Sequence, residues 1–134
     1  MPLDDTGFRD RYEPLDKIDR VIDLLATEER WCQGHLVTAD GRRCILGAIR
    51  AVDGTRVLTR PVSSAIRQVT GRRFGCIGSH IIPRFNDDRG TTHALVMTVL
   101  LQARENIIRG VAEDHGAAIG RRPLNRLYRR LPIS

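Results

Sequence analysis

The chain is poor in aromatic residues and contains no long apolar run. Aromatic side chains make up 4% of its 134 residues, so the core must consist mainly of leucine, isoleucine, valine and alanine, a composition that suits packed helices. No apolar stretch approaches the roughly 18 residues of a membrane span. The N-terminal stretch MPLDDTGFRDRYEP is acidic and lacks the apolar region of a secretory signal. We therefore expect neither a membrane segment nor a signal peptide.

Cysteine and lysine are also scarce. The three cysteines, Cys32, Cys44 and Cys76, form an odd set with no scaffold spacing, so we expect reduced thiols in a cytoplasmic protein. Lys17 is the only lysine among 22 basic residues. This arginine bias reflects either guanidinium chemistry directed at phosphate and carboxylate groups or the codon usage of a GC-rich genome.

The net charge of +6 is unevenly distributed along the chain. Residues 1–30 contain nine acidic and five basic side chains, whereas residues 31–134 contain seven acidic and seventeen basic ones. Such a basic surplus favours loose attraction to nucleic acid or to acidic surfaces. We expect a flexible N-terminus over residues 1–13, one globular domain over 14–112 and a basic, arginine-rich tail over 113–134.

Hydrophobic periodicity predicts a mainly α fold. We expect four or five helices packed around a central helix at 91–109, with at most one short β-hairpin near 35–44. Thr91 or Thr92 can cap the central helix, and Gly110 can end it.

The remaining helix boundaries are predicted mainly from proline and glycine. One helix is expected at 14–31, starting at Pro14. A second is expected at 43–52, before Asp53-Gly54, and a third at 60–71, with Pro61 in its first turn and Gly71 at its end. In the apolar segment 76–85, Pro83 is expected to limit any helix.

Several short motifs occur in a fixed order. They are Trp31 with Gly34, Asp40-Gly41, Cys44 with Gly47-Ala48, and Asn86-Asp87 followed by threonines ahead of the long helix. This order resembles a diffuse group of small uncharacterised bacterial and phage proteins with the pattern DG-x-x-C-x-x-G-A/V-L, a variable middle, then ND and a threonine-led helix. The resemblance covers about residues 15–109. It implies a domain boundary and a set of focal residues, and it implies no activity.

Cys44 has two opposed interpretations. As a nucleophile, it would be activated by a helix N-terminus and by the neighbouring arginines. His93 or His80 would then serve as the base, with Asn86 or Asp87 as the orienting group, in a cysteine-dependent hydrolase. As a structural residue, Cys44 would be buried beside Ile45 and Leu46, where an apolar environment raises the thiol pKa, and Gly47 would admit a crossing helix. We favour the structural interpretation.

Asn86 and Asp87 also have two interpretations. If their segment and Cys44 each open a helix, two helix N-termini converge and form a shallow polar site suited to anions. Alternatively, the same residues bond their own backbone in an Asx turn and shape the entry to the next helix. The structural role is the more common one for such residues.

The sequence also contains candidate residues for a metal site and for a nucleic-acid site. Cys32, His35, Cys76 and His80 have ligand-like spacing within each pair, which would suit tetrahedral zinc, but unrelated thiols are the simpler interpretation and we expect no metal and no cofactor. In the tail, a set of arginines could bind phosphates weakly beside Tyr128. These are Arg121, Arg122, Arg126, Arg129 and Arg130.

The function favoured by the sequence is that of a non-catalytic binding or accessory domain with a site near Cys44 and Asn86. The alternatives are the cysteine hydrolase and nucleic-acid binding through the arginine-rich tail. The expected partner is an unidentified protein or an anionic molecule, and a homodimer remains open.

Overall fold

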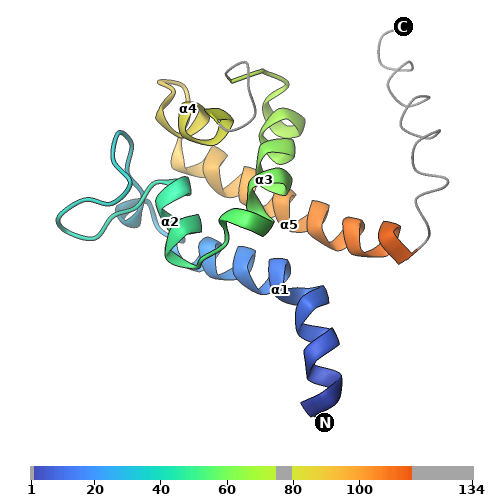
Figure 1. The fold of residues 1–134 in the computed structure, drawn as a ribbon. Coiled ribbons are helices and arrows are strands. Elements are labelled where there is room, and N and C mark those ends of the chain that lie inside the picture. Colours follow the sequence, from blue (N-terminus) through green and yellow to red (C-terminus); the bar gives the residue numbers. More distant parts are fainter. Residues whose placement is uncertain (1, 75–79, 116–134) are drawn as a thin grey trace, which may run out of the picture.

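The computed structural model describes the backbone of residues 2–74 and 80–115 and the side chains of residues 12–74 and 80–110. Within these ranges the chain forms five α-helices and one short 3-10 helix, with isolated β-bridges and no strand (Figure 1). The elements are α1 (Pro2–Leu24), η1 (Glu28–Arg30), α2 (Ile45–Ala51), α3 (Thr55–Thr70), α4 (Ile81–Asp87) and α5 (His93–His115). The mainly helical prediction is confirmed.

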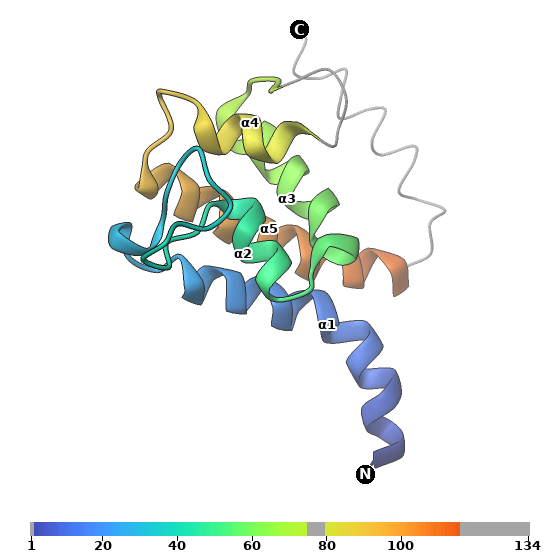
Figure 2. The same cartoon turned by 60° about the vertical axis from the view of Figure 1, so that its left-hand side comes forward.

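Helix α1 starts earlier than expected. It begins at Pro2, and Pro14 lies inside it, so the predicted start at Pro14 is wrong. Proline removes one backbone hydrogen bond and commonly kinks a helix, and α1 bends part way along its length (Figure 1). Its N-terminal part projects away from the other helices in both views (Figure 2). The flexibility of residues 1–13 stays a prediction.

Helix α3 also starts before its proline. Asp53, with φ 56°, and Gly54 follow α2 as predicted, but α3 begins at Thr55 and contains Pro61. Its first turn is held by the amide of Leu58, which donates to the Gly54 carbonyl over 2.8 Å. The apolar side chain of Leu58 is fully buried, so the extra turn contributes to the core. Gly71 ends the helix in a left-handed conformation, as predicted.

The second half of the chain contains one short helix and one longer than expected. Pro83 is the third residue of the seven-residue helix α4, in the first turn, where no intrahelical N–H bond is required. This position is compatible with the expected limit on a helix there. Gly110 does not end α5, which continues to His115. The predicted cap is confirmed, because the Leu95 amide donates to Thr92 Oγ1 over 3.1 Å.

Residues 35–44 form a tight turn. The Thr38 amide donates to the Arg42 carbonyl over 2.8 Å, and the Gly41 amide donates to the Thr38 carbonyl over 2.9 Å. One antiparallel bridge joins Val37 to Arg43. The turn therefore keeps within the prediction of at most one short hairpin.

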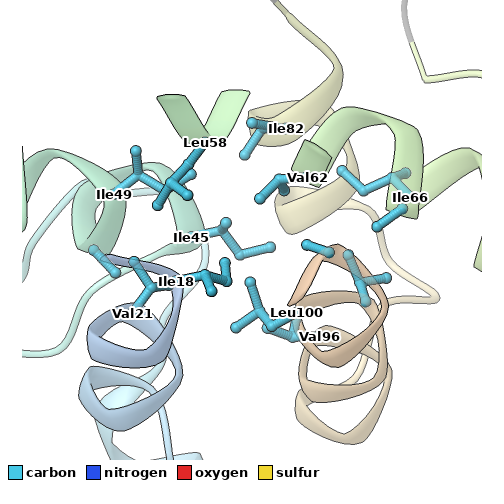
Figure 3. Packing of buried hydrophobic residues seen from close by; sticks show 14 of the residues in the cluster. Ile18, Val21, Ile45, Ile49, Leu58, Val62, Ile66, Ile82, Val96 and Leu100 are labelled. Atoms are coloured by element: carbon cyan, nitrogen blue, oxygen red, sulfur yellow. The ribbon is translucent and has the colours of Figure 1, made fainter. Parts of the chain in front are cut away.

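The core is aliphatic and centred on α5, which packs most extensively against α3 and then against α1. Figure 3 shows branched side chains from all five α-helices converging. The labelled residues are Ile18, Val21, Ile45, Ile49, Leu58, Val62, Ile66, Ile82, Val96 and Leu100. No helix in the described part of the chain is both long enough and apolar enough to cross a bilayer.

Candidate functional site

Asn86, near the end of α4, is the centre of a buried hydrogen-bond network. Its side chain is 0% exposed. Its Oδ1 accepts from Trp31 Nε1 over 2.8 Å and from the Ile45 amide over 3.1 Å. Its Nδ2 donates to the Cys32 carbonyl over 3.1 Å and to Asp87 Oδ1 over 3.0 Å. An asparagine side chain has two acceptor and two donor positions, so every position of Asn86 is occupied.

A second layer of contacts ties the loop after η1 to the end of α4. Gln33 Nε2 donates to the carbonyls of Asn86 and Asp88 over 2.8 and 3.0 Å. The Gly34 amide donates to Asp87 Oδ1 over 2.9 Å. We call this network, made by residues 31–34, Ile45 and 86–88, the Asn86 clasp. It joins three segments that are distant in sequence.

Cys44 is the N-cap of α2. Its Sγ accepts from the Gly47 amide over 3.3 Å, and its side chain is buried. Burial raises the pKa of the Cys44 thiol, although nearby backbone amides act in the opposite direction. Burial and the capping contact with Gly47 both fit the structural interpretation of Cys44.

Gly47 is required by a close approach of backbones. A Cβ placed on it would lie 2.0 Å from the Leu36 carbonyl oxygen. The same oxygen accepts from the Cys44 amide over 3.2 Å. The crossing segment is thus the loop at Leu36, and the predicted crossing helix is wrong.

The structure brings Cys44 and Asn86 together, as predicted, but not as two helix N-termini. Asn86 and Asp87 are the last residues of α4, whereas Cys44 precedes α2. The Asx turn lies one residue further on, where Asp88 Oδ2 accepts from the Gly90 amide over 3.0 Å. The anion site expected from two converging helix starts is therefore not formed.

The two candidate histidines lie in different surroundings. His93 Nε2 lies 2.7 Å from the Leu25 carbonyl oxygen, and its ring is tilted against that of Trp31, with 6.1 Å between centroids. His80 is exposed at the start of α4. Among the described residues, no hydrogen bond connects either imidazole to Cys44.

The zinc candidates and the tail are only partly described. Cys32 Sγ donates to the His35 carbonyl over 3.4 Å, and Cys76 lies outside the described residues. In the described ranges, no three histidine, cysteine or acidic side chains gather as metal ligands would. The tail arginines also lie outside the described residues. They are Arg121, Arg122, Arg126, Arg129 and Arg130.

A different feature, which the sequence interpretation missed, lies along α3. A hollow of about 860 Å³ is bordered by four arginines. They are Arg56, Arg60, Arg67 and Arg73. Val57, Pro61, Phe74 and Ile81 supply apolar lining, and Thr59 and Ser63 supply hydroxyl groups. We call this hollow the α3 groove.

The α3 groove has a strongly positive rim. Arg56, Arg60 and Arg67 are spaced so that they share one helical face with Ser63. None of the four groove arginines forms an ion pair with a described carboxylate. Like charges four residues apart destabilise a helix, so the placement of Arg56 and Arg60 lowers the stability of α3. Stability therefore does not explain these residues.

Ser63 adds a second signal. The residue is 6% exposed, and its Oγ has no hydrogen-bond partner among the described residues. Leaving a buried hydroxyl unpaired costs about 1–3 kcal/mol. A ligand oxygen in the α3 groove would satisfy it. Helical spacing from Thr55 onward would have revealed the whole stripe, but the predicted helix began too late to include Arg56.

The fold and the groove define a small α-helical domain with a sealed polar clasp and an open cationic groove. The chain belongs to the family of unknown function DUF6197, whose match spans residues 10–106. This match includes the clasp and the α3 groove, and it confirms the resemblance to a domain of unknown function. Comparisons with curated proteins and with solved structures find no match.

Asn86→Asp should destabilise the fold by about 3 kcal/mol or more at neutral pH, because it replaces both Nδ2 donors by a buried carboxylate beside Asp87. The pKa of the new carboxyl should be raised. Its protonated form should therefore be favoured on folding, so the deficit should shrink as the pH falls. Urea denaturation at neutral and mildly acidic pH measures both effects. Asn106→Asp, at a half-buried site on α5, is the control and should cost about 1 kcal/mol. Equal losses in the two variants would contradict a central role for Asn86.

The raised pKa of the Cys44 thiol predicts a loss of stability in alkali. Between the ordinary thiol pKa of about 8.5 and the higher native value, the unfolded chain loses a proton that the folded chain keeps. The free energy of unfolding should therefore fall as the pH rises above about 8.5. Cys44→Ser keeps a cap acceptor for Gly47 and should reduce this dependence, and the part that remains belongs to Cys32, whose pKa is also raised by burial. Rapid alkylation of native Cys44 near neutral pH would refute the assignment.

Proposed function

We propose that the chain is a non-catalytic binding domain that holds a ligand with several phosphate groups in the α3 groove. The observation that carries the proposal is the combination, in one hollow, of four guanidinium groups and a buried Ser63 hydroxyl. Among the described residues the four arginines form no ion pair and the hydroxyl has no hydrogen-bond partner. Guanidinium groups form bidentate, charge-assisted hydrogen bonds with phosphate. The arginine side chains and the Ser63 hydroxyl place hydrogen-bond donors around the groove, and an anion supplies acceptors for them.

The length of the arginine stripe supports a ligand with more than one anionic group. Arg56 and Arg67 are separated by about 16 Å along the axis of α3. One phosphate cannot contact both ends of this stripe. Phosphate oxygens can also accept from two guanidinium groups and a hydroxyl at once, which suits the neighbourhood of Ser63.

The hydrolase alternative has less support. The Cys44 thiol caps α2 and is buried, His93 contacts the Leu25 carbonyl, and His80 is exposed. Nucleic-acid binding through the tail stays a prediction, because the tail is outside the described residues. A cytoplasmic location is part of the proposal and is supported by free, buried thiols at Cys32 and Cys44.

Arg60→Glu should weaken binding of inorganic polyphosphate to the full chain by more than tenfold, because it places a negative charge at the centre of the stripe. The new carboxylate lies four residues after Arg56, so it should pair with it and leave the fold at least as stable. Arg30→Glu on η1 is the matched control, since α2 lies between η1 and α3 in both views. Isothermal titration calorimetry measures affinity. Equal losses in the two variants would mean that net charge alone drives binding and would overturn the α3 site.

Ser63→Ala should raise stability and lower affinity together. Removing an unpaired buried hydroxyl should stabilise the fold by about 1 kcal/mol more than Ser64→Ala, which has the same helix-propensity gain at a half-buried neighbour. Polyphosphate affinity should fall only in the Ser63 variant. Thermal denaturation and calorimetry test this pair. A Ser63 variant that binds like wild type would show that the hydroxyl does not face the ligand.

A further inference from the structure

A second hollow continues from the α3 groove. Its volume is about 560 Å³, and it shares Arg73 and Phe74 with the groove. It extends along α4 past Arg84 to Asp87 and Asp88. The two hollows therefore adjoin at Arg73 and Phe74.

Arg72 differs from the groove arginines at this junction. Its guanidinium lies over the ring of Phe74, 4.5 Å from the centroid. Its Nη1 also lies 3.5 Å from Asp88 Oδ2. The ring of Phe74 is in turn held by an edge contact with Phe85, with 5.5 Å between centroids. Arg72 thus contacts both an aromatic ring and a carboxylate, unlike the groove arginines.

The stacking partner of a guanidinium plane is a flat, aromatic group. The Arg72 side chain is 60% exposed, so one side of the guanidinium contacts Phe74 and the rest remains accessible. Nucleobases stack on guanidinium planes as well as on aromatic rings. A phosphate gains less here than at Arg60 or Arg67, because Asp88 competes for the charge of Arg72.

We infer that the ligand is a single-stranded nucleic acid, with its phosphates on the α3 groove and one base stacked on Arg72. The inference rests on the proposed function and adds the ligand class to it. The arginines of the α3 groove would bind the phosphates, and Arg72, which contacts Phe74 and Asp88, would bind a base. Proteins bind single strands in this way without strict sequence preference.

Other polyanions fit less well. In a duplex the bases are already stacked inside the helix, so none is available to Arg72. An acidic peptide could pair with the groove arginines but has no flat group for the Arg72 plane. Base-free polyphosphate would use the groove alone. The affinities for a duplex, an acidic peptide and polyphosphate are therefore expected not to change when residue 72 loses its planar group.

Arg72→Lys tests the inference, because lysine keeps the charge that pairs with Asp88 but loses the plane. The probes are a labelled single strand of about twelve nucleotides, which spans a typical binding site, and an abasic strand of the same length. Fluorescence anisotropy with the full chain should show about a tenfold loss for the normal strand in Arg72→Lys and no change for the abasic strand. Arg84→Lys, in the same hollow but without a ring contact, is the control.

The outcomes separate the two proposals. Loss of base-dependent binding in Arg72→Lys but not in Arg84→Lys supports the inference. Equal binding of normal and abasic strands by the wild-type chain overturns it and leaves phosphate binding intact, as does equal sensitivity of the two variants. Tighter binding of a duplex or of polyglutamate overturns it in favour of those ligands. No binding of any strand or of polyphosphate overturns the proposed function itself.

Discussion

The complete hydrogen bonding of one buried amide, Asn86, is the constraint on which the rest of the structure depends. The loop over residues 33–43 contributes little apolar burial, since Leu36 and Val37 are 42% and 48% exposed. Hydrophobic packing alone therefore cannot hold it. Asn86 replaces packing with four directed bonds inside a low-dielectric core, where paired polar groups are strong and unpaired ones are costly. The loop can then lie against Gly47 and form the cap of α2.

The clasp and the groove divide the polar chemistry of the domain. In the clasp, Asn86 has every donor and acceptor used, which gives rigidity and leaves nothing for a ligand. On α3, Leu58, Val62 and Ile66 are buried in the core, and the arginine stripe occupies the opposite side of the same helix. Polar groups with hydrogen-bond partners thus lie in the clasp, and polar groups without partners among the described residues line the α3 groove. This distribution is expected where residues are selected for binding rather than for stability.

The sequence revealed the strongly periodic parts of this fold and missed the parts that depend on tertiary contacts. The central helix, its Thr92 cap and the packed role of Cys44 followed from local rules. The starts of α1 and α3 did not, because Pro14 and Pro61 were interpreted as first-turn residues, whereas both helices continue through their prolines. On α3 the buried side chain of Leu58, which precedes Pro61, contributes to the core. Placing α3 too late also hid Arg56 from the stripe. The proximity of Cys44 and Asn86 was predicted from the sequence. The hydrogen bonds that Asn86 forms there, such as the bond to the Cys32 carbonyl, were not, because no spacing rule specifies them.

The α3 groove places two energetic costs on one helix face. Adjacent like charges at Arg56 and Arg60 oppose helix formation, and the buried Ser63 hydroxyl lacks a partner. Both costs would be removed by the same event, the arrival of an anion that supplies oxygen acceptors and negative charge. Under the proposed function, binding and folding would be linked, because a ligand that binds only the folded chain stabilises it in proportion to the logarithm of its concentration. The hydrogen bonds of the Asn86 clasp, on α2 and α4, contribute stability that offsets the unfavourable face of α3.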